Sequence, residues 1–308
     1  MSEIAARRDY IARGKTAAAA NTGRVFGAKK HIDPASVFLK GITFAGAFLT
    51  VSVLLLIIAF VLVNGLPNIH ADLFELSYNS ENCSVLPAIL NTAEMTLLSL
   101  LAAVPAGILA AVFLVEYADN TGKIVAWIRI TAETLSGIPS IVYGLFGLLF
   151  FSTACGLGYS MLSGSLTLAI MILPLIMRTS EEALKSVPVS YREASFGLGA
   201  GKLRTILQVV IPPAMPGILS GIILATGRIV GETAALLYTA GTVAQIAGIS
   251  DSGRTLAVHM YVLSTEGLHI DKAYATAVVL LAMVFVINRL SELAAFRKKP
   301  GSFRGKRG

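Results

Sequence analysis

Six long apolar stretches dominate this chain and restrict the folds open to it. They lie near residues 38–63, 89–115, 138–152, 161–177, 216–240 and 272–292. A helix of about 20 residues crosses a hydrocarbon layer of about 30 Å, and most of these stretches approach or exceed that length. A backbone in lipid must satisfy its own hydrogen bonds, and none of the stretches alternates with period two. The sequence therefore predicts an all-α integral membrane protein with six transmembrane helices.

The overall composition agrees with a membrane protein. Hydrophobic residues make up 55% of the 308 residues and charged residues 14%. Soluble domains usually contain about 25% charged residues. A chain with so few charges cannot cover its apolar surface with polar groups in water.

The positive charge is unevenly distributed along the chain. Of the 25 Lys and Arg residues, 22 lie in the ranges 1–40, 116–137, 178–215 and 289–308. The loops 64–88 and 153–163 contain none. Cytoplasmic loops carry the excess of Lys and Arg, so we expect six spans with both termini in the cytoplasm. The net charge of +7 thus reflects topology, with the lipid bilayer as partner and no nucleic acid.

The ends of the chain are predicted to be basic cytoplasmic tails. Residues 1–37 form the N-terminal tail and 293–308 the C-terminal one. The span 38–63 exceeds the 7–15 apolar residues of a signal peptide core, so we expect it to remain as an anchor. Cys83 and Cys155 both lie near the predicted outer side. A disulfide there is one alternative, and two separate thiols are the favoured one.

The sequence contains no complete catalytic or cofactor-binding motif. Gly14-Lys15-Thr16 resembles the end of a phosphate-binding P-loop, but Asp9 occupies the position where that motif needs Gly. The four histidines are dispersed, and no pair has metal-ligand spacing with a third ligand nearby. No nucleophile is accompanied by a base. We expect a non-enzymatic chain without cofactor or metal.

A polar insert, residues 190–213, separates the fourth and fifth apolar stretches. Ser190 and Glu193 have the spacing of a capping box just after Pro188, which predicts a helix beginning at Tyr191. Gly199 or Gly201 can supply the left-handed residue that ends it.

A second short helix is predicted to follow the insert's glycines. It runs over residues 202–210, and Pro212-Pro213 is expected to stop it. A helix pair this short is marginal by itself in water, so it should pack against something larger.

The fifth apolar stretch contains charge. Arg228 lies near its middle, and Glu232 follows one turn later, on the same face of a continuous helix. Because a lone charge at bilayer depth is costly, we expect the two side chains to neutralise each other inside the bundle. Two pairs of glycines with small-xxx-small spacing, 217/221 and 227/231, predict close approach of neighbouring helices. Pro139 is expected to mark a turn between a short helix and the third span.

The insert resembles the EAA loop of ABC importer permeases. The resemblance rests on Glu193-Ala194-Ser195, on Gly199 four residues later, and on Val209-Val-Ile-Pro212. The family usually has Ala where this chain has Ser195. In that family the loop docks on a separate ATPase. The resemblance implies that an ABC ATPase contacts Ser190, Arg192, Glu193, Ala194, Ser195 and Gly199.

Three further runs are similar to the permease of phosphate-specific ABC importers, PstA type. They are residues 135–147, 174–182 and 227–239, within a core of 85–292 that carries the loop near 178–215. The resemblance implies the type I ABC importer permease fold in a bacterial plasma (inner) membrane. It also implies ABC ATPase subunits, a second homologous permease and an extracytoplasmic phosphate-binding protein as partners. Arg228, Glu232 and Thr233 would lie on the phosphate pathway.

Other functions remain alternatives. The chain could be the sister permease of the same importer or a permease for another oxyanion. A stand-alone channel or secondary transporter would need an inverted repeat or a relay of ionisable residues, and the sequence has neither.

Overall fold

The computed structural model describes residues 34–118 and 122–297, and these residues form helices and loops without a strand. The predicted tails fall almost entirely outside these ranges. The long helices are α2 (Pro34–Gly65), α3 (Leu86–Val112), α6 (Met161–Lys185), α9 (Ile211–Val230) and α12 (Ile270–Arg297). The short ones are α4 (Lys123–Ser136), α5 (Ser140–Gly147), α7 (Val189–Gly197), α8 (Lys202–Thr205), α10 (Ala234–Thr239) and α11 (Leu256–Glu266).

Short segments of other helix types extend these elements. The 3-10 helices are η1 (Leu66–Asn68) and η2 (Ala71–Phe74), and the π-helices are η3 (Phe113–Tyr117), η4 (Leu148–Ala154) and η5 (Ile206–Val210). Each π-helix directly continues an α-helix, so α3 with η3 forms one long helix.

The membrane spans agree with the six-span prediction. Within the described ranges, five helices are long and apolar enough to cross a membrane. A sixth span results if α4 and α5–η4 count as one, and this pair bends by 102°. The bend falls between Ser136 and Ser140, at the expected Pro139. Pro139 lacks an N–H and cannot continue a helix without a break.

The chain divides into two compact units at Ile58, inside α2. The helix α2 is apolar on most of its surface, and no residue of its spanning window is buried. A helix that is hydrophobic on every face suits a lipid environment. The helix that contains the predicted anchor runs from Pro34 to Gly65 and not from 38 to 63.

Within the second unit, α6 is the central helix. Two thirds of its spanning window is buried (67%), and it packs against α3, α9, α5, α10 and α4. The first predicted glycine pair lies in this packing: a Cβ on Gly217 would overlap Ala183, and one on Gly221 would overlap Thr179. Close approach of α9 to α6 therefore requires both glycines.

The second predicted glycine pair does not support helix packing. A Cβ on Gly227 would meet nothing within 4 Å, and one on Gly231 would meet only the Gly227 carbonyl. Among the described residues the prediction is wrong, because Gly227 faces open space and Gly231 lies after the end of α9 at Val230.

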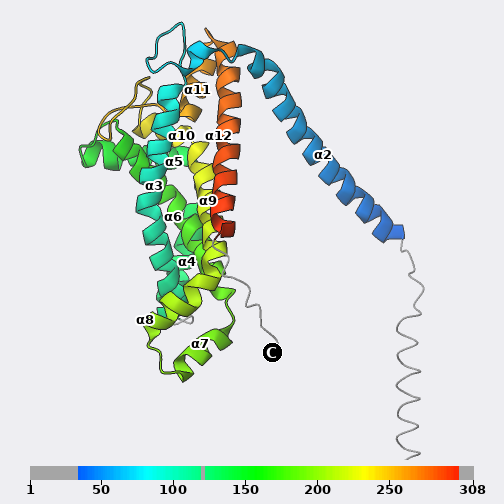
Figure 1. The fold of residues 1–308 in the computed structure, drawn as a ribbon, viewed down its shortest axis with the longest axis vertical. Helices are drawn as coiled ribbons and strands as arrows, with labels where there is room; N and C mark the ends of the chain where they lie inside the picture. Colours follow the sequence, from blue (N-terminus) through cyan, green and yellow to red (C-terminus); the bar gives the residue numbers. More distant parts are fainter. Residues whose placement is uncertain (1–33, 119–121, 298–308) are drawn as a thin grey trace, which may run out of the picture. The chain divides into compact units, whose positions relative to one another are not determined.

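The two ends of this unit carry different structures. The helices α7 and α8 lie at one end, and α11 lies at the other, beside the loop that joins α2 to α3 (Figure 1). We call residues 66–85 the α2–α3 loop, and residues 189–205 the α7–α8 elbow.

Candidate functional site

The first helix of the elbow begins earlier than predicted and lacks the capping box. Pro188 is the N-cap of α7, and no side chain caps the helix. Ser190 and Glu193 both lie inside α7, with exposed side chains. The prediction is wrong because Pro188, with φ −55° and ψ 139°, already starts the helix at Val189.

The end of α7 is formed as predicted by a left-handed glycine. Gly199 has φ +81°. Its N–H donates to the Phe196 carbonyl at 2.9 Å, and the Ala200 N–H donates to the Ser195 carbonyl at 3.1 Å. These two bonds are those of a Schellman motif. The alternative, Gly201, is instead the N-cap of α8, with φ −72°.

The second elbow helix is not stopped by the prolines. The chain remains helical from Lys202 to Val230 through α8, η5 and α9. Pro212 lies in the first turn of α9, directly after the π-helical turn 206–210. Proline has no backbone N–H, and a residue in the first turn of an α-helix needs none for the hydrogen bonds within the helix. The predicted break at Pro212 therefore does not occur.

Arg192 anchors the elbow to the membrane helices. Its Nε and Nη2 donate to Glu116 Oε1 at 2.9 and 2.7 Å. Its Nη1 and Nη2 also donate to the carbonyls of Val187 and Leu184, at the end of α6. The Arg192 and Glu116 side chains are only 15% and 7% exposed. One arginine thus joins α7, the end of α3–η3 and the last turn of α6.

A second bond closes the elbow internally. Ser195 Oγ and Thr205 Oγ1 lie 2.8 Å apart, and both residues are buried. Ser195 is the position where the related family usually has Ala. Here its hydroxyl joins α7 to α8 in place of a methyl contact.

The remaining elbow side chains face outward. Glu193 and Ala194 are exposed. Several large apolar residues are exposed as well, namely Val189, Tyr191, Phe196, Leu198 and Leu203. A groove of about 520 Å³ lies between α7 and α8–η5 and is lined by Tyr191, Ala194, Leu198 and Arg204, among others. An exposed apolar patch on such a short element is typical of a protein contact surface.

A further ion-pair cluster was not predicted from the sequence. Glu181 on α6 is buried, and its Oε1 accepts from Arg129 of α4 at 2.9 Å and from Lys185 at 2.6 Å. The spacing of Glu181 and Lys185 is visible in the sequence, but the approach of α4 is not. Glu116 was missed for the same reason, because its partner lies 76 residues away.

The structure corrects the predicted pairing of Arg228 with Glu232. Arg228 lies in the last turn of α9 and is exposed, whereas Glu232 is buried after the helix has ended. Glu232 Oε1 instead accepts from the Ala235 N–H at 3.1 Å, at the start of α10. No ion pair joins the two within the described ranges. The prediction that both side chains lie on one helix face is wrong, because the helix breaks at residues 231–233.

Arg228 lines an open groove of about 610 Å³. The groove's other walls are α6 and α12, and its polar residues are Ser220, Asn288 and Glu292. Thr233, the third predicted pathway residue, is half-buried at the start of α10. The structure therefore places Arg228 in a groove but does not bring Glu232 into it.

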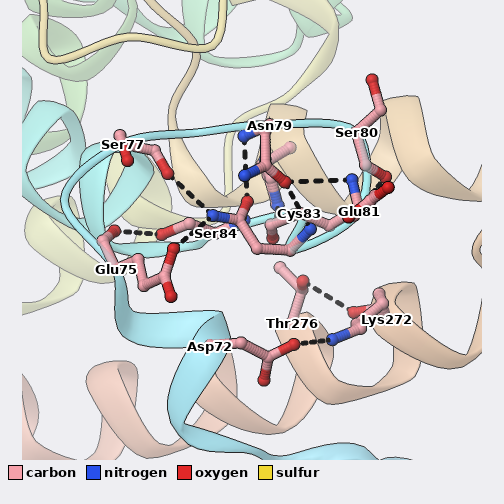
Figure 2. Close-up of polar contacts among 12 residues, drawn as sticks. Asp72, Glu75, Ser77, Asn79, Ser80, Glu81, Cys83, Ser84, Lys272 and Thr276 are labelled. Carbon is pink, nitrogen blue, oxygen red and sulfur yellow. Dashed lines mark hydrogen bonds and ion pairs between the residues drawn. The ribbon is translucent and has the colours of Figure 1, made fainter.

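The opposite end of the unit contains the folded α2–α3 loop (Figure 2). The Asn79 side chain accepts from the Glu81 and Asn82 N–H groups, and Ser84 Oγ donates to the Glu75 carbonyl. Lys272 of α12 donates to Asp72 at 2.8 Å, and this hydrogen bond lowers the pKa of Asp72. Cys83 and Cys155 are both free thiols, as the favoured interpretation expected.

A comparison with protein families decides what kind of chain this is. Residues 103–299 match the family described as "Binding-protein-dependent transport system inner membrane component". This chain belongs to that family. The matched region includes the elbow, the ion-pair clusters and the Arg228 groove.

Individual relatives point in the same direction. The chain is 38% identical over 215 residues to "Probable ABC transporter permease protein YqgI" of Bacillus subtilis, covering 64% of this chain and 73% of that protein. It is 44% identical over 139 residues to "Phosphate transport system permease protein PstA 1" of Mycobacterium tuberculosis, covering 45% of each. The resemblance to PstA-type permeases is thus confirmed, over less than half of that relative's length.

The fold is shared with solved ABC importers. A chain of the bacterial alginate ABC transporter, in complex with its alginate pentasaccharide-bound periplasmic protein, matches with a TM-score of 0.66. The match covers 87% of this chain and 97% of that chain at 16% identity. The predicted type I importer permease fold is confirmed, and the chain is a permease component of an ABC importer.

Proposed function

We propose that this chain is one half of the translocation pathway of an ATP-driven phosphate importer. The relatives named as phosphate permeases and the three PstA-like runs support phosphate as the substrate. In this proposal a second permease completes the pathway, ATPase subunits bind the α7–α8 elbow, and a phosphate-binding protein docks at the α11 end. The elbow then faces the cytoplasm of a bacterium and the α11 end faces outward.

The observation that carries the proposal is the anchoring of the elbow by Arg192. A docking element must move together with the helices that it drives, and Arg192 is tied to Glu116, to the Leu184 carbonyl of α6 and to the Val187 carbonyl just after α6. A buried charge pair with additional hydrogen bonds holds its geometry well. ATPase closure against the exposed face of α7 would therefore be passed to α3 and α6 as a largely rigid-body motion.

Arg228 is the residue proposed to meet phosphate on its path. It is an exposed cation on a spanning helix, in a groove that also contains Ser220 and Asn288. Arginine offers a planar set of donors that fits a phosphate oxyanion. Glu232 has a positioning role in this proposal, since it holds the start of α10, and Thr233 lies directly beside it.

Uptake into vesicles tests the proposal. The complete importer, reconstituted with its binding protein and ATP, should take up inorganic phosphate. Arg228→Gln should lower uptake at least about tenfold. Arg228→Lys should lower uptake less, because Lys keeps the positive charge but not the planar set of donors of a guanidinium. Arg178→Gln is the matched control, as it removes a charge from an exposed i,i+4 pair on α6. Normal uptake by Arg228→Gln would remove Arg228 from the pathway.

A competition assay tests the substrate. Excess sulfate or molybdate should leave phosphate uptake unchanged in the complete importer. Preferred uptake of either ion over phosphate would contradict the substrate assignment, while the role of the chain as a permease would stand.

A further inference from the structure

Arg254 is a buried cation with no acceptor in the part of the chain that the structure describes. Only 4% of the residue is exposed, and its Nε and Nη2 are both buried without a hydrogen-bond partner. Its Cζ lies 4.4 Å from the centre of the Tyr78 ring, on the α2–α3 loop. An arginine stays charged at physiological pH, and a buried charge is costly unless it is paired. Nε and Nη2 form one edge of the guanidinium, the edge that binds an oxyanion with two parallel hydrogen bonds.

Two further buried polar atoms near Arg254 also lack partners. They are Thr255 Oγ1 and His259 Nδ1. His259 Nε2 lies 3.2 Å from the Cys83 carbonyl oxygen, so this nitrogen donates and Nδ1 remains as an acceptor. Burial, aided by the charge of Arg254, lowers the pKa of His259 to about 3, so the ring is neutral. The His259 and Tyr78 rings are 6.0 Å apart, edge to face, so Tyr78 contacts both Arg254 and His259.

The backbone around these residues favours an anion and holds them in place. Thr255 is the N-cap of α11, a helix of 11 residues, and its side chain makes no capping bond. A helix N-terminus carries a positive partial charge, although the first N–H of α11, that of Leu256, already donates to Thr92 Oγ1 at 2.8 Å. Asn91 of α3 donates to the Arg254 carbonyl at 3.1 Å, and the Arg254 N–H donates to Val243. The nearby cation Lys272 is already paired with Asp72.

We propose that Arg254, Thr255 and His259 form a second oxyanion site at the α11 end, covered by Tyr78. The site takes a tetrahedral oxyanion that carries a proton, and the assignment of this anion as hydrogen phosphate rests on the proposed function. Two of its oxygens accept from Arg254 Nε and Nη2, and its hydroxyl donates to His259 Nδ1. Sulfate has no proton to donate near neutral pH, so it cannot make the last bond.

The α2–α3 loop must open to admit the anion, because the unpartnered atoms are buried beneath it. Among the described residues, the contacts that hold the loop to the rest of the unit include the Asp72–Lys272 ion pair (Figure 2), the Cys83 carbonyl on His259 and the Tyr78 ring on Arg254. Cys83 is itself fully buried, and burial raises the pKa of its thiol. Its reactivity therefore reports on opening of the loop.

Equilibrium binding of labelled inorganic phosphate tests the site. The complete importer would be placed in lipid nanodiscs without the binding protein. Arg254→Gln should weaken phosphate binding at this site by about tenfold or more, and Arg254→Lys should weaken it less. His259→Gln keeps a donor for the Cys83 carbonyl but loses the Nδ1 acceptor. It should reduce the preference for phosphate over sulfate. The Arg178→Gln control should bind phosphate normally.

A thiol-labelling assay separates lost binding from misfolding. In a Cys155→Ser background, phosphate should slow the labelling of Cys83 at least about threefold, and Arg254→Gln should abolish this effect while Cys83 stays protected without phosphate. Unchanged phosphate binding and labelling in Arg254→Gln would overturn the site and leave only buried water beside Arg254. Loss of binding confined to Arg228→Gln would also overturn it and leave the proposed function intact. Uptake of another oxyanion in place of phosphate would instead contradict the proposed function.

Discussion

Arg192 of α7 donates two hydrogen bonds to a single carboxylate oxygen of Glu116, at the end of the α3–η3 helix. The two residues are 76 positions apart in sequence, and both side chains are largely buried. This pair directly connects the elbow with the α3–η3 helix, and we expect its loss to affect coupling before assembly.

Glu116→Gln tests that connection. The amide keeps the shape of the side chain but leaves the Arg192 charge without a counter-charge, and breaking a buried pair typically costs about 3–5 kcal/mol. Uptake should fall at least about tenfold while the ATPase subunit still co-purifies, because the outer face of α7 is unchanged. Exchange of the two residues, with Glu116→Arg and Arg192→Glu combined, should restore part of the uptake. Full coupling in Glu116→Gln would contradict the role of the pair.

The two elbow glycines form a matched pair for a backbone test. A Cβ at Gly199 or at Gly201 would meet nothing within 4 Å, but only Gly199 has a left-handed φ, of +81°. Gly199→Ala should therefore destabilise the elbow by about 1–2 kcal/mol, whereas Gly201→Ala should be nearly neutral. Limited proteolysis of the elbow in detergent measures the difference. Equal protease sensitivity of the two variants would argue against the Schellman end of α7.

A similar comparison tests the α6–α9 contact. Gly221→Ala would place its Cβ against Thr179, while Gly227→Ala has free space around it. Overpacking of a close helix contact typically costs about 1–3 kcal/mol. The melting temperature of the purified protein should fall for Gly221→Ala and stay near the wild-type value for Gly227→Ala. Equal melting temperatures would mean that the glycine is not required for the contact.

The cap that Glu232 provides for α10 depends on an acceptor and not on a charge. Glu232→Gln keeps an oxygen for the Ala235 N–H, so it should leave the melting temperature nearly unchanged. Glu232→Ala removes the cap and should cost about 1 kcal/mol. A large loss of stability in Glu232→Gln would show that the carboxylate charge itself is needed, contrary to this geometry.

His259 should make the stability depend on pH. Its pKa is lowered to about 3 in the folded chain, and it is about 6.5 in the unfolded chain. As the pH falls below about 6.5 the unfolded chain takes up a proton first, so folding loses at most about 1.4 kcal/mol per pH unit down to about pH 3. Thermal unfolding at about pH 7 and pH 5 should show this loss in the wild type and a smaller one in His259→Gln. Identical pH slopes would mean that His259 is not held neutral by its surroundings.

The sequence by itself determined the elements that depend on local chemistry. Apolar length predicted the number of spans, because lipid leaves the backbone no other partner, but the helix of the fifth stretch ends at Val230 and not at residue 240. Pro139 fixed the bend before α5, and Gly199 fixed the end of α7, because only a few residues suit those backbone conformations. The elbow motif was visible for the same reason, since its spacing is local.

The tertiary structure decided what depends on side chains that are distant in sequence. The predicted capping box of Ser190 and Glu193 does not form, because the helix already begins directly after Pro188. The predicted Arg228–Glu232 pair does not form, because α9 ends at Val230. Glu116, the carboxylate partner of Arg192, and Arg129, a partner of Glu181, lie on helices that no sequence spacing relates to them. A charged residue within an apolar sequence indicates only that it needs a partner. The packing of the helices decides which group becomes that partner.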